Sequence, residues 1–192
     1  LFAPGLEVVA TPEQYNQLFT MHGTIMLLMF ATPLFAGFAN VLMPLQIGAP
    51  DVAFPRLNLA SLYVYWFGAA MAVSTLVLGG VDTGWTFYTP YSTTTGGGVS
   101  MMVLAAFVLG FSSIFTGVNF IATVHRMRAP GLTWFRLPLF VWAHYATSLV
   151  MVLGTPVVAI TLFLLGLERT LGFGFFDPAK GGDPLLYQHL FW

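Results

Sequence analysis

Residues 15–44 read YNQLFTMHGTIMLLMFATPLFAGFANVLMP, and this stretch decides the fold. It is almost wholly apolar, and no charged residue occurs between Glu13 and Asp51. Roughly 20 helical residues cross the hydrocarbon core of a bilayer, so the stretch is long enough to span it with a tilt or with a kink at Pro33. The sequence therefore predicts a transmembrane helix here.

The composition of the whole chain supports a membrane setting. Of its 192 residues, 57% are hydrophobic and only 7% are charged, and the mean hydropathy is +0.82. A soluble domain of this size carries about 25% charged residues. The chain has no cysteine, which excludes disulfides and thiolate metal sites, and its net charge of −1 argues against a nucleic-acid partner. We conclude that the lipid bilayer surrounds this protein.

Breaker-rich loops divide the chain into apolar runs, which predict an all-α, polytopic transmembrane helix bundle. We expect one transmembrane region, 1–192, with complete spans at about 16–45, 57–79, 99–124 and 137–167, a kink at Pro156 and the start of a fifth span at 185–192. The polar connection 79–98 is read as an external loop, either ordered or partly disordered. The chain begins with Leu1, without a recognisable signal, and ends at Trp192 inside an apolar run, so we expect it to be a piece of a longer protein.

Basic residues set the expected orientation. The loops after the first and third predicted spans hold four arginines, namely Arg56, Arg126, Arg128 and Arg136. Residues 1–15 and 79–98 hold no lysine or arginine. Positive charge favours the cytoplasmic side. The Asp51 and Arg126 loops are therefore predicted to face the cytoplasm or a mitochondrial matrix, and His22 to lie nearer the outer side. Arg169 and Lys180 weaken this bias a little.

His22 is the first candidate functional residue. It lies inside the first span, where an ionisable group is costly and by default suggests function. A neutral imidazole can hold a metal through one nitrogen and donate a hydrogen bond through the other. Tyr15 and Met26 share its side of the predicted helix, and Gly23 leaves room for close approach. Taken alone, however, a lone membrane histidine is more often hydrogen-bonded to a neighbouring helix, so both interpretations stay open.

A second group of polar residues clusters toward the predicted inner side. The group comprises one loop carboxylate with amides and hydroxyls from three spans: Asp51, Asn40, Asn58, Asn119, Ser112 and Ser113. Polar groups in hydrocarbon need partners. If they converge, they form a wet path from a carboxylate that collects protons. Otherwise Asp51 is a solvated loop residue and the amides join helices; spacing alone does not decide between these interpretations.

Five long motifs bring in a resemblance. QLFTMHGTIM (17–26), GFANVLMPLQIGAPDVAFPRLN (37–58), DTGWTFY (82–88), FSSIFTGVNFI (111–121) and FFDPAKGGDPLLYQHLFW (175–192) resemble subunit I of the haem–copper oxidases. The likeness is greatest to cytochrome c oxidase subunit 1 of the branch with a carboxylate-headed proton pathway. It covers essentially the whole chain, although YSTTTGGG at 91–98 departs from the expected pattern. The resemblance implies spans two to five of a twelve-span subunit.

The resemblance also implies roles for individual residues. His22 would be an axial ligand of the low-spin haem iron, with Tyr15 and Met26 beside that haem. Trp85 would lie near a haem propionate and Trp192 near the copper centre, with His189 as a structural neighbour. Proton uptake would begin at Asp51 and continue past the other polar residues: Asn40, Asn58, Asn119, Ser112 and Ser113.

For the intact protein, the resemblance implies a proton-pumping terminal oxidase that oxidises cytochrome c and reduces oxygen to water. Its cofactors would be a low-spin haem, of the a type, a high-spin haem and copper, and its partners would be subunits II and III. The oxygen-reducing centre would lie beyond Trp192, so we expect no activity from this chain alone. A bacterial plasma membrane is favoured over the mitochondrial inner membrane. A quinol oxidase of the same superfamily, or an unrelated channel or transporter, remains the alternative.

Overall fold

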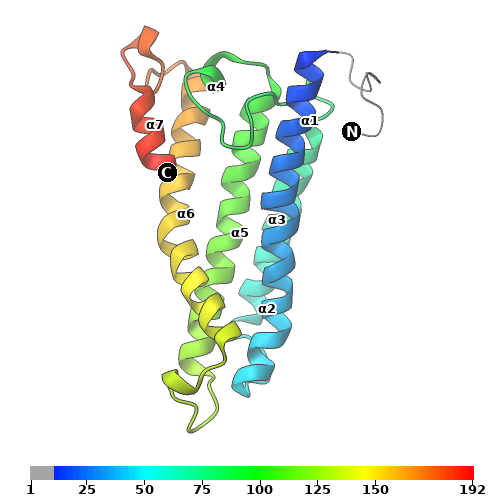
Figure 1. Ribbon diagram of the computed structural model, residues 1–192, viewed down its shortest axis with the longest axis vertical. Coiled ribbons are helices and arrows are strands. Elements are labelled where there is room, and N and C mark those ends of the chain that lie inside the picture. Colours follow the sequence, from blue (N-terminus) through cyan, green and yellow to red (C-terminus); the bar gives the residue numbers. More distant parts are fainter. Residues whose placement is uncertain (1–10) are drawn as a thin grey trace, which may run out of the picture.

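The computed structural model describes residues 11–192, which form long helices running side by side (Figure 1). The first consists of α1 (Pro12–Thr24), a π-helical segment (Ile25–Ala31) and α2 (Thr32–Ile47), and it is followed by α3 (Pro55–Ser74), α5 (Gly98–Arg126) and α6 (Leu139–Leu171). Within the described residues, these are four helices long and apolar enough to cross a membrane. The predicted all-α bundle with four long apolar helices is therefore confirmed.

Local sequence signals mark several helix ends. Thr11 caps α1 by accepting a hydrogen bond from the backbone N–H of Gln14, and Asp183 caps α7 (Pro184–Phe191) in the same way. Both caps are followed by a proline, a residue well suited to the first turn of a helix. Gly48 and Gly172 end α2 and α6 with a φ of 75°. This left-handed conformation suits a residue without a Cβ atom.

The first span widens into a π-helix just before Pro33. Proline has no N–H, so it cannot donate to the carbonyl of Met29 four residues earlier. Tyr65 of α3 supplies the donor instead, with its hydroxyl 2.7 Å from the Met29 oxygen. The predicted irregularity at Pro33 is thus a π-helical segment whose exposed carbonyl is bonded across to α3.

The outer connection docks on α1. Residues 75–79 form turns rather than helix, so α3 ends at Ser74. The following loop contains the short α4 (Tyr91–Thr94). Gln17 donates to the Gly79 carbonyl over 3.1 Å, and the Thr20 hydroxyl accepts from the Gly84 N–H over 2.9 Å. The loop is therefore an ordered cover over one end of the bundle.

Two hydrophobic cores hold the bundle, and α5 packs along both α3 and α6. The core at the end that carries the 79–98 loop includes Met102, Phe87, Phe176 and Tyr187. The core at the opposite end includes Met43, Ile47, Phe120, Val124 and Val141. Along α5, the first core uses residues up to Ala106 and the second begins at Phe120. The intervening stretch lines a cavity.

Candidate functional site: a polar-lined cavity and an uncovered face of α1

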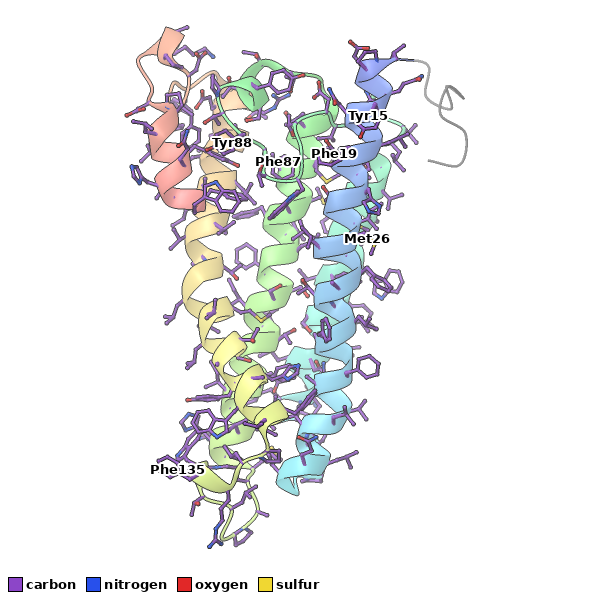
Figure 2. The ribbon with its side chains drawn as sticks, viewed as in Figure 1. Tyr15, Phe19, Met26, Phe87, Tyr88 and Phe135 are labelled. Atoms are coloured by element: carbon purple, nitrogen blue, oxygen red, sulfur yellow. The ribbon has the colours of Figure 1, made fainter. Side chains whose placement is uncertain are left out.

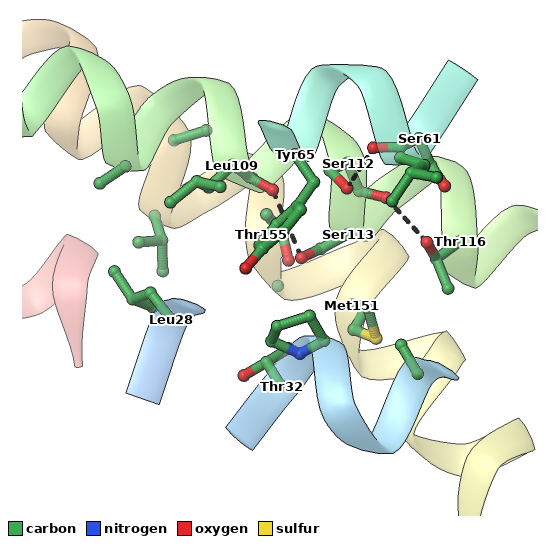
Figure 3. Close-up of a pocket in the computed structure, with 18 of the residues that line it drawn as sticks. Leu28, Thr32, Ser61, Tyr65, Leu109, Ser112, Ser113, Thr116, Met151 and Thr155 are labelled. Atoms are coloured by element: carbon green, nitrogen blue, oxygen red, sulfur yellow. Dashed lines mark hydrogen bonds between the residues drawn. The ribbon is translucent and has the colours of Figure 1, made fainter. Parts of the chain in front are cut away.

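A cavity of about 730 Å³ lies among α2, α3, α5 and α6 (Figure 3). Much of its wall is apolar, and Trp85, Phe87 and Phe191 line it from the outer loop and α7. Polar side chains from all four helices interrupt that wall: Thr32, Asn40, Asn58, Ser61, Tyr65, Ser112, Ser113, Thr116 and Thr155. Four of the residues predicted to form a proton path therefore line the same cavity.

Asn40 presents an unpaired group at this cavity. Its Nδ2 donates to the Ala36 carbonyl over 2.8 Å, but its Oδ1 is buried and has no hydrogen-bond partner among residues 11–192. Buried amide oxygens in folded proteins normally accept a hydrogen bond from protein or from water. Because the cavity beside Asn40 is roomy and polar side chains interrupt its apolar wall, water is the partner that this oxygen suits.

The hydroxyl groups on α5 use their protons within the protein. Ser112 donates to the Ser61 carbonyl of α3 over 2.8 Å, Ser113 to the Leu109 carbonyl over 3.4 Å and Thr116 to the Ser112 carbonyl over 3.0 Å (Figure 3). A hydroxyl that donates its proton still has lone pairs to accept a bond. These oxygens are therefore oriented as acceptors for water.

Asn119 does not line the cavity. It is fully buried, its Oδ1 accepts from the Phe54 N–H over 2.9 Å and its Nδ2 donates to the Phe54 carbonyl over 3.2 Å. Thr123, one turn further on, accepts from the Ala53 N–H over 2.8 Å. Both side chains thus fix the loop between α2 and α3.

Asp51 lies on that same loop and is exposed. Its Oδ1 accepts from the backbone N–H of Val52 over 2.7 Å, and it does not contribute to the cavity wall. The structure therefore places Asp51 on a loop whose position Asn119 and Thr123 determine, below a cavity that Asn40 borders.

His22 lies on an uncovered face of α1. The residue is exposed, and within residues 11–192 its imidazole makes no hydrogen bond. The same face carries Tyr15, Phe19 and Met26, which are 62%, 61% and 42% exposed (Figure 2). The opposite face, with Thr20, Met21 and Thr24, is buried. An imidazole with both nitrogens unpaired on a broad apolar face fits an axial ligand of a flat macrocycle, so these residues suit a haem.

Trp85 fills the space beside Gly23. A Cβ atom on Gly23 would lie 3.2 Å from Cδ1 of Trp85. Trp85 in turn makes edge-to-face contacts with Phe191 and Trp192, at centroid distances of 6.3 and 6.5 Å. The group that approaches Gly23 closely is therefore the indole of Trp85. Trp85 and Trp192 do come together, one residue along from His22.

Sequence reasoning missed several residues. Tyr65 lines the cavity and donates to the π-helical segment, and the missing N–H of Pro33 was the signal that could have pointed to such a donor.

Glu168 is buried, and its Oε2 accepts from the N–H groups of Phe175 and Phe176 at 3.0 and 2.7 Å. Arg169 donates to three carbonyl oxygens of the outer loop and to one hydroxyl on α5, those of Ser92, Thr95, Gly96 and Ser100. Adjacent opposite charges inside an apolar helix were the available signal for this pair.

The family of this chain is shown by a match over its whole length. Residues 1–192 match the family described as "Cytochrome C and Quinol oxidase polypeptide I". The chain belongs to this family. All predicted site residues fall inside the matched region, and the family is one of membrane subunits with haem and copper.

Individual members of the oxidase polypeptide I family are closely similar in sequence to this chain. "Probable cytochrome c oxidase subunit 1-alpha" of Streptomyces avermitilis is 52% identical over 100% of this chain and 34% of its own length. "Cytochrome c oxidase subunit 1" of Corynebacterium glutamicum is 45% identical over 100% of the chain and 33% of its own length. The protein of the same name from Synechocystis sp. is 43% identical over 94% of the chain. The chain thus spans about a third of the length of the curated relatives it matches.

Proposed function

We propose that this chain is part of the catalytic subunit of a proton-pumping respiratory terminal oxidase, which oxidises cytochrome c and reduces oxygen to water. The family match over residues 1–192 supports the class of protein. The observation that carries the functional part is the cavity that gathers Asn40, Asn58, Ser112 and Ser113 from three separate helices. A channel of unrelated origin would not account for both.

In this proposal His22 is one axial ligand of a low-spin haem, of the a type. When bound, such a haem supplies one-electron transfer, at a potential set by its ligands and surroundings. His22 would hold the iron through an imidazole nitrogen, while Tyr15 and Met26 would flank the ring. Trp85 would lie on the outer side near a haem propionate, and Trp192 would lie near the copper centre of the intact subunit. The unpaired nitrogens of His22 and the exposed apolar face around it support this assignment.

In the same proposal Asp51 collects protons and the cavity carries ordered water. A carboxylate on an exposed loop exchanges protons readily with solution, and neutral amides and hydroxyls can orient water without trapping the proton. The unpaired Oδ1 of Asn40 and the acceptor hydroxyls of Ser112 and Ser113 support this path. Asn58 lines the same wall. Asn119 acts by fixing the loop that presents Asp51.

The setting proposed is a bacterial plasma membrane, with the Asp51 and Arg126 loops in the cytoplasm. Bacterial relatives named as cytochrome c oxidase subunits support this choice. The intact subunit would also hold a high-spin haem and copper, would assemble with subunits II and III and would receive electrons from cytochrome c. Quinol is the second candidate donor, because the family description includes quinol oxidases.

The deciding experiment is spectroscopy of the full-length oxidase carrying His22→Ala. We expect the low-spin haem absorbance to disappear from the reduced-minus-oxidised spectrum. His125→Ala is the matched control, because His125 lies in the last turn of α5, where its imidazole contacts the Tyr145 hydroxyl. This variant should leave the low-spin haem band unchanged. A normal low-spin band in the His22 variant would overturn the assignment. Turnover with reduced cytochrome c but not with a quinol would separate the two donors.

A further inference from the structure

An aromatic cluster closes the turn between α5 and α6. The ring of Trp134 lies 5.1 Å from His125, 5.2 Å from Tyr145 and 5.5 Å from Trp142, measured between centroids. The Tyr145 hydroxyl lies 2.8 Å from Nε2 of His125, and Trp142 donates to the Trp134 carbonyl over 3.0 Å. These contacts give the turn a fixed shape, and Arg128 packs against it through the ring of Trp134.

The residues around this cluster are those of a membrane interface. Phe135 is 98% exposed at the end of the bundle (Figure 2). Leu139 is 86% exposed. Tryptophan and tyrosine collect at the level of lipid headgroups, where one side of the ring is apolar and the other is wet. This composition is typical of a turn at the depth of the lipid phosphates.

Three arginines at this turn have no anionic partner among residues 11–192. Arg126 and Arg136 make no hydrogen bond or ion pair there. The guanidinium carbon of Arg128 lies 4.1 Å above the Trp134 ring, and its Nη1 is buried without an acceptor. A buried charged donor without a partner is costly, and guanidinium groups pair especially well with phosphate. The turn therefore presents clustered positive charge that suits an anionic group.

An apolar groove leads to the same turn along α5. It has a volume of about 350 Å³ and is lined by Val118, Ile121, Ala122, His125 and Arg126. These residues recur at the spacing of one helical face, so the groove follows the helix axis from an apolar end to a cationic end. Such a groove matches an acyl chain joined to a charged headgroup.

We propose that the α5 groove and the α5–α6 turn bind one anionic phospholipid from the surrounding bilayer. An acyl chain lies along Val118, Ile121 and Ala122, and the phosphate accepts hydrogen bonds from Arg126 and Arg128. The clustered positive charge, the aromatic belt and the apolar groove favour a lipid over a neighbouring protein subunit, which would need its own carboxylates at this depth. This site goes beyond the proposed oxidase function and does not depend on it.

The test uses the full-length oxidase in lipid nanodiscs that contain photoactivatable phosphatidylglycerol, or photoactivatable phosphatidylcholine for comparison. Mass spectrometry then locates the crosslinks. We expect phosphatidylglycerol to label residues 118–126 about fivefold more than phosphatidylcholine, and the double variant Arg126→Gln/Arg128→Gln to lose about fivefold or more of that label. Arg56→Gln is the matched control, because it removes an exposed arginine from the first turn of α3, and it should keep full labelling.

A second variant tests the groove itself. Ala122→Trp should fill the groove and abolish labelling at 118–126 while the arginines remain. The haem spectrum of each preparation checks folding and stays separate from the lipid readout. Equal labelling by the two lipids, labelling that survives the arginine changes, or no labelling because another subunit covers this face would each overturn the proposal.

Discussion

The hydroxyl of Tyr65 donates a 2.7 Å hydrogen bond to the carbonyl of Met29, joining α3 to the π-helical segment of the first span. The bond replaces the donor that Pro33 cannot supply. It lies between the face of α1 that carries His22 and the wall of the cavity, which Tyr65 itself lines. One bond therefore joins the span that carries His22 to a residue of the cavity wall.

Tyr65→Phe should remove this bond to the Met29 carbonyl. We expect a loss of about 1 kcal/mol in the free energy of unfolding, in line with hydrogen bonds between membrane helices. Thermal unfolding of the full-length oxidase, followed by its haem absorbance, measures the effect. Tyr63→Phe is the control, because Tyr63 is 65% exposed and makes no such bond. Equal stability of the two variants would contradict the role given to Tyr65.

Gly23→Ala should disturb the indole of Trp85. The new Cβ atom would lie 3.2 Å from Cδ1 of Trp85, so the ring must move by a few tenths of an ångström. Overpacking of this kind costs about 1–3 kcal/mol and offsets the gain of up to about 1 kcal/mol that alanine brings to a helix.

Gly37→Ala is the matched control for Gly23→Ala. A Cβ atom there meets no other atom within 4 Å, so this variant should be stabilised. We expect the low-spin haem band of the oxidase to shift in the Gly23 variant and to stay in place in the Gly37 variant. A band that shifts equally in both variants would show that helix propensity, not contact with Trp85, is responsible.

The sequence was sufficient for the helices but not for the relations between them. Unbroken apolar runs and cap–proline pairs predict where helices form, because these signals act locally. Asn40, Asn58 and Ser112 lie on three different helices, and no local rule says whether they meet. Their convergence on one cavity depends on how α5 packs between its neighbours.

The contacts between α5 and α3 recur at a regular spacing in the sequence. Ser112 bonds the Ser61 carbonyl and Asn119 bonds the backbone of Phe54, so residues seven apart on α5 meet residues seven apart on an antiparallel α3. Seven residues are close to two helical turns, which puts both α5 side chains on one face. The spacing alone could have shown that Ser112 and Asn119 share a partner helix. It could not have shown that Asn119 is engaged by backbone while Ser112 borders open space.

Asp51→Asn in the full-length oxidase should slow turnover and proton pumping while the haem spectrum stays normal. An amide cannot bind and release a proton near neutral pH, so the collector is lost. We expect turnover to fall by about tenfold, a modest share of what a positioned proton-transfer group contributes. Oxygen uptake and proton release by the oxidase in vesicles measure both quantities.

The control for Asp51→Asn is Asp82→Asn, which neutralises a carboxylate in the loop that docks on α1 at the other end of the bundle. That carboxylate accepts a bond from the hydroxyl of Tyr91 and raises the pKa of this tyrosine. We expect pumping to survive in this variant. Normal pumping in the Asp51 variant as well would remove Asp51 from the path.

The orientation of the bundle can be measured with single cysteines, because the chain contains none of its own. Pro130→Cys places a thiol on the α5–α6 turn, and Thr94→Cys places one in α4, at opposite ends of the bundle (Figure 1). Both positions are exposed. Four arginines in the inner loops favour the cytoplasm for the first end. A membrane-impermeant maleimide added to intact cells should therefore label Thr94→Cys and reach Pro130→Cys only after the membrane is opened. Labelling of Pro130→Cys in intact cells would show that the predicted orientation is wrong and that the Asp51 loop lies outside the cytoplasm.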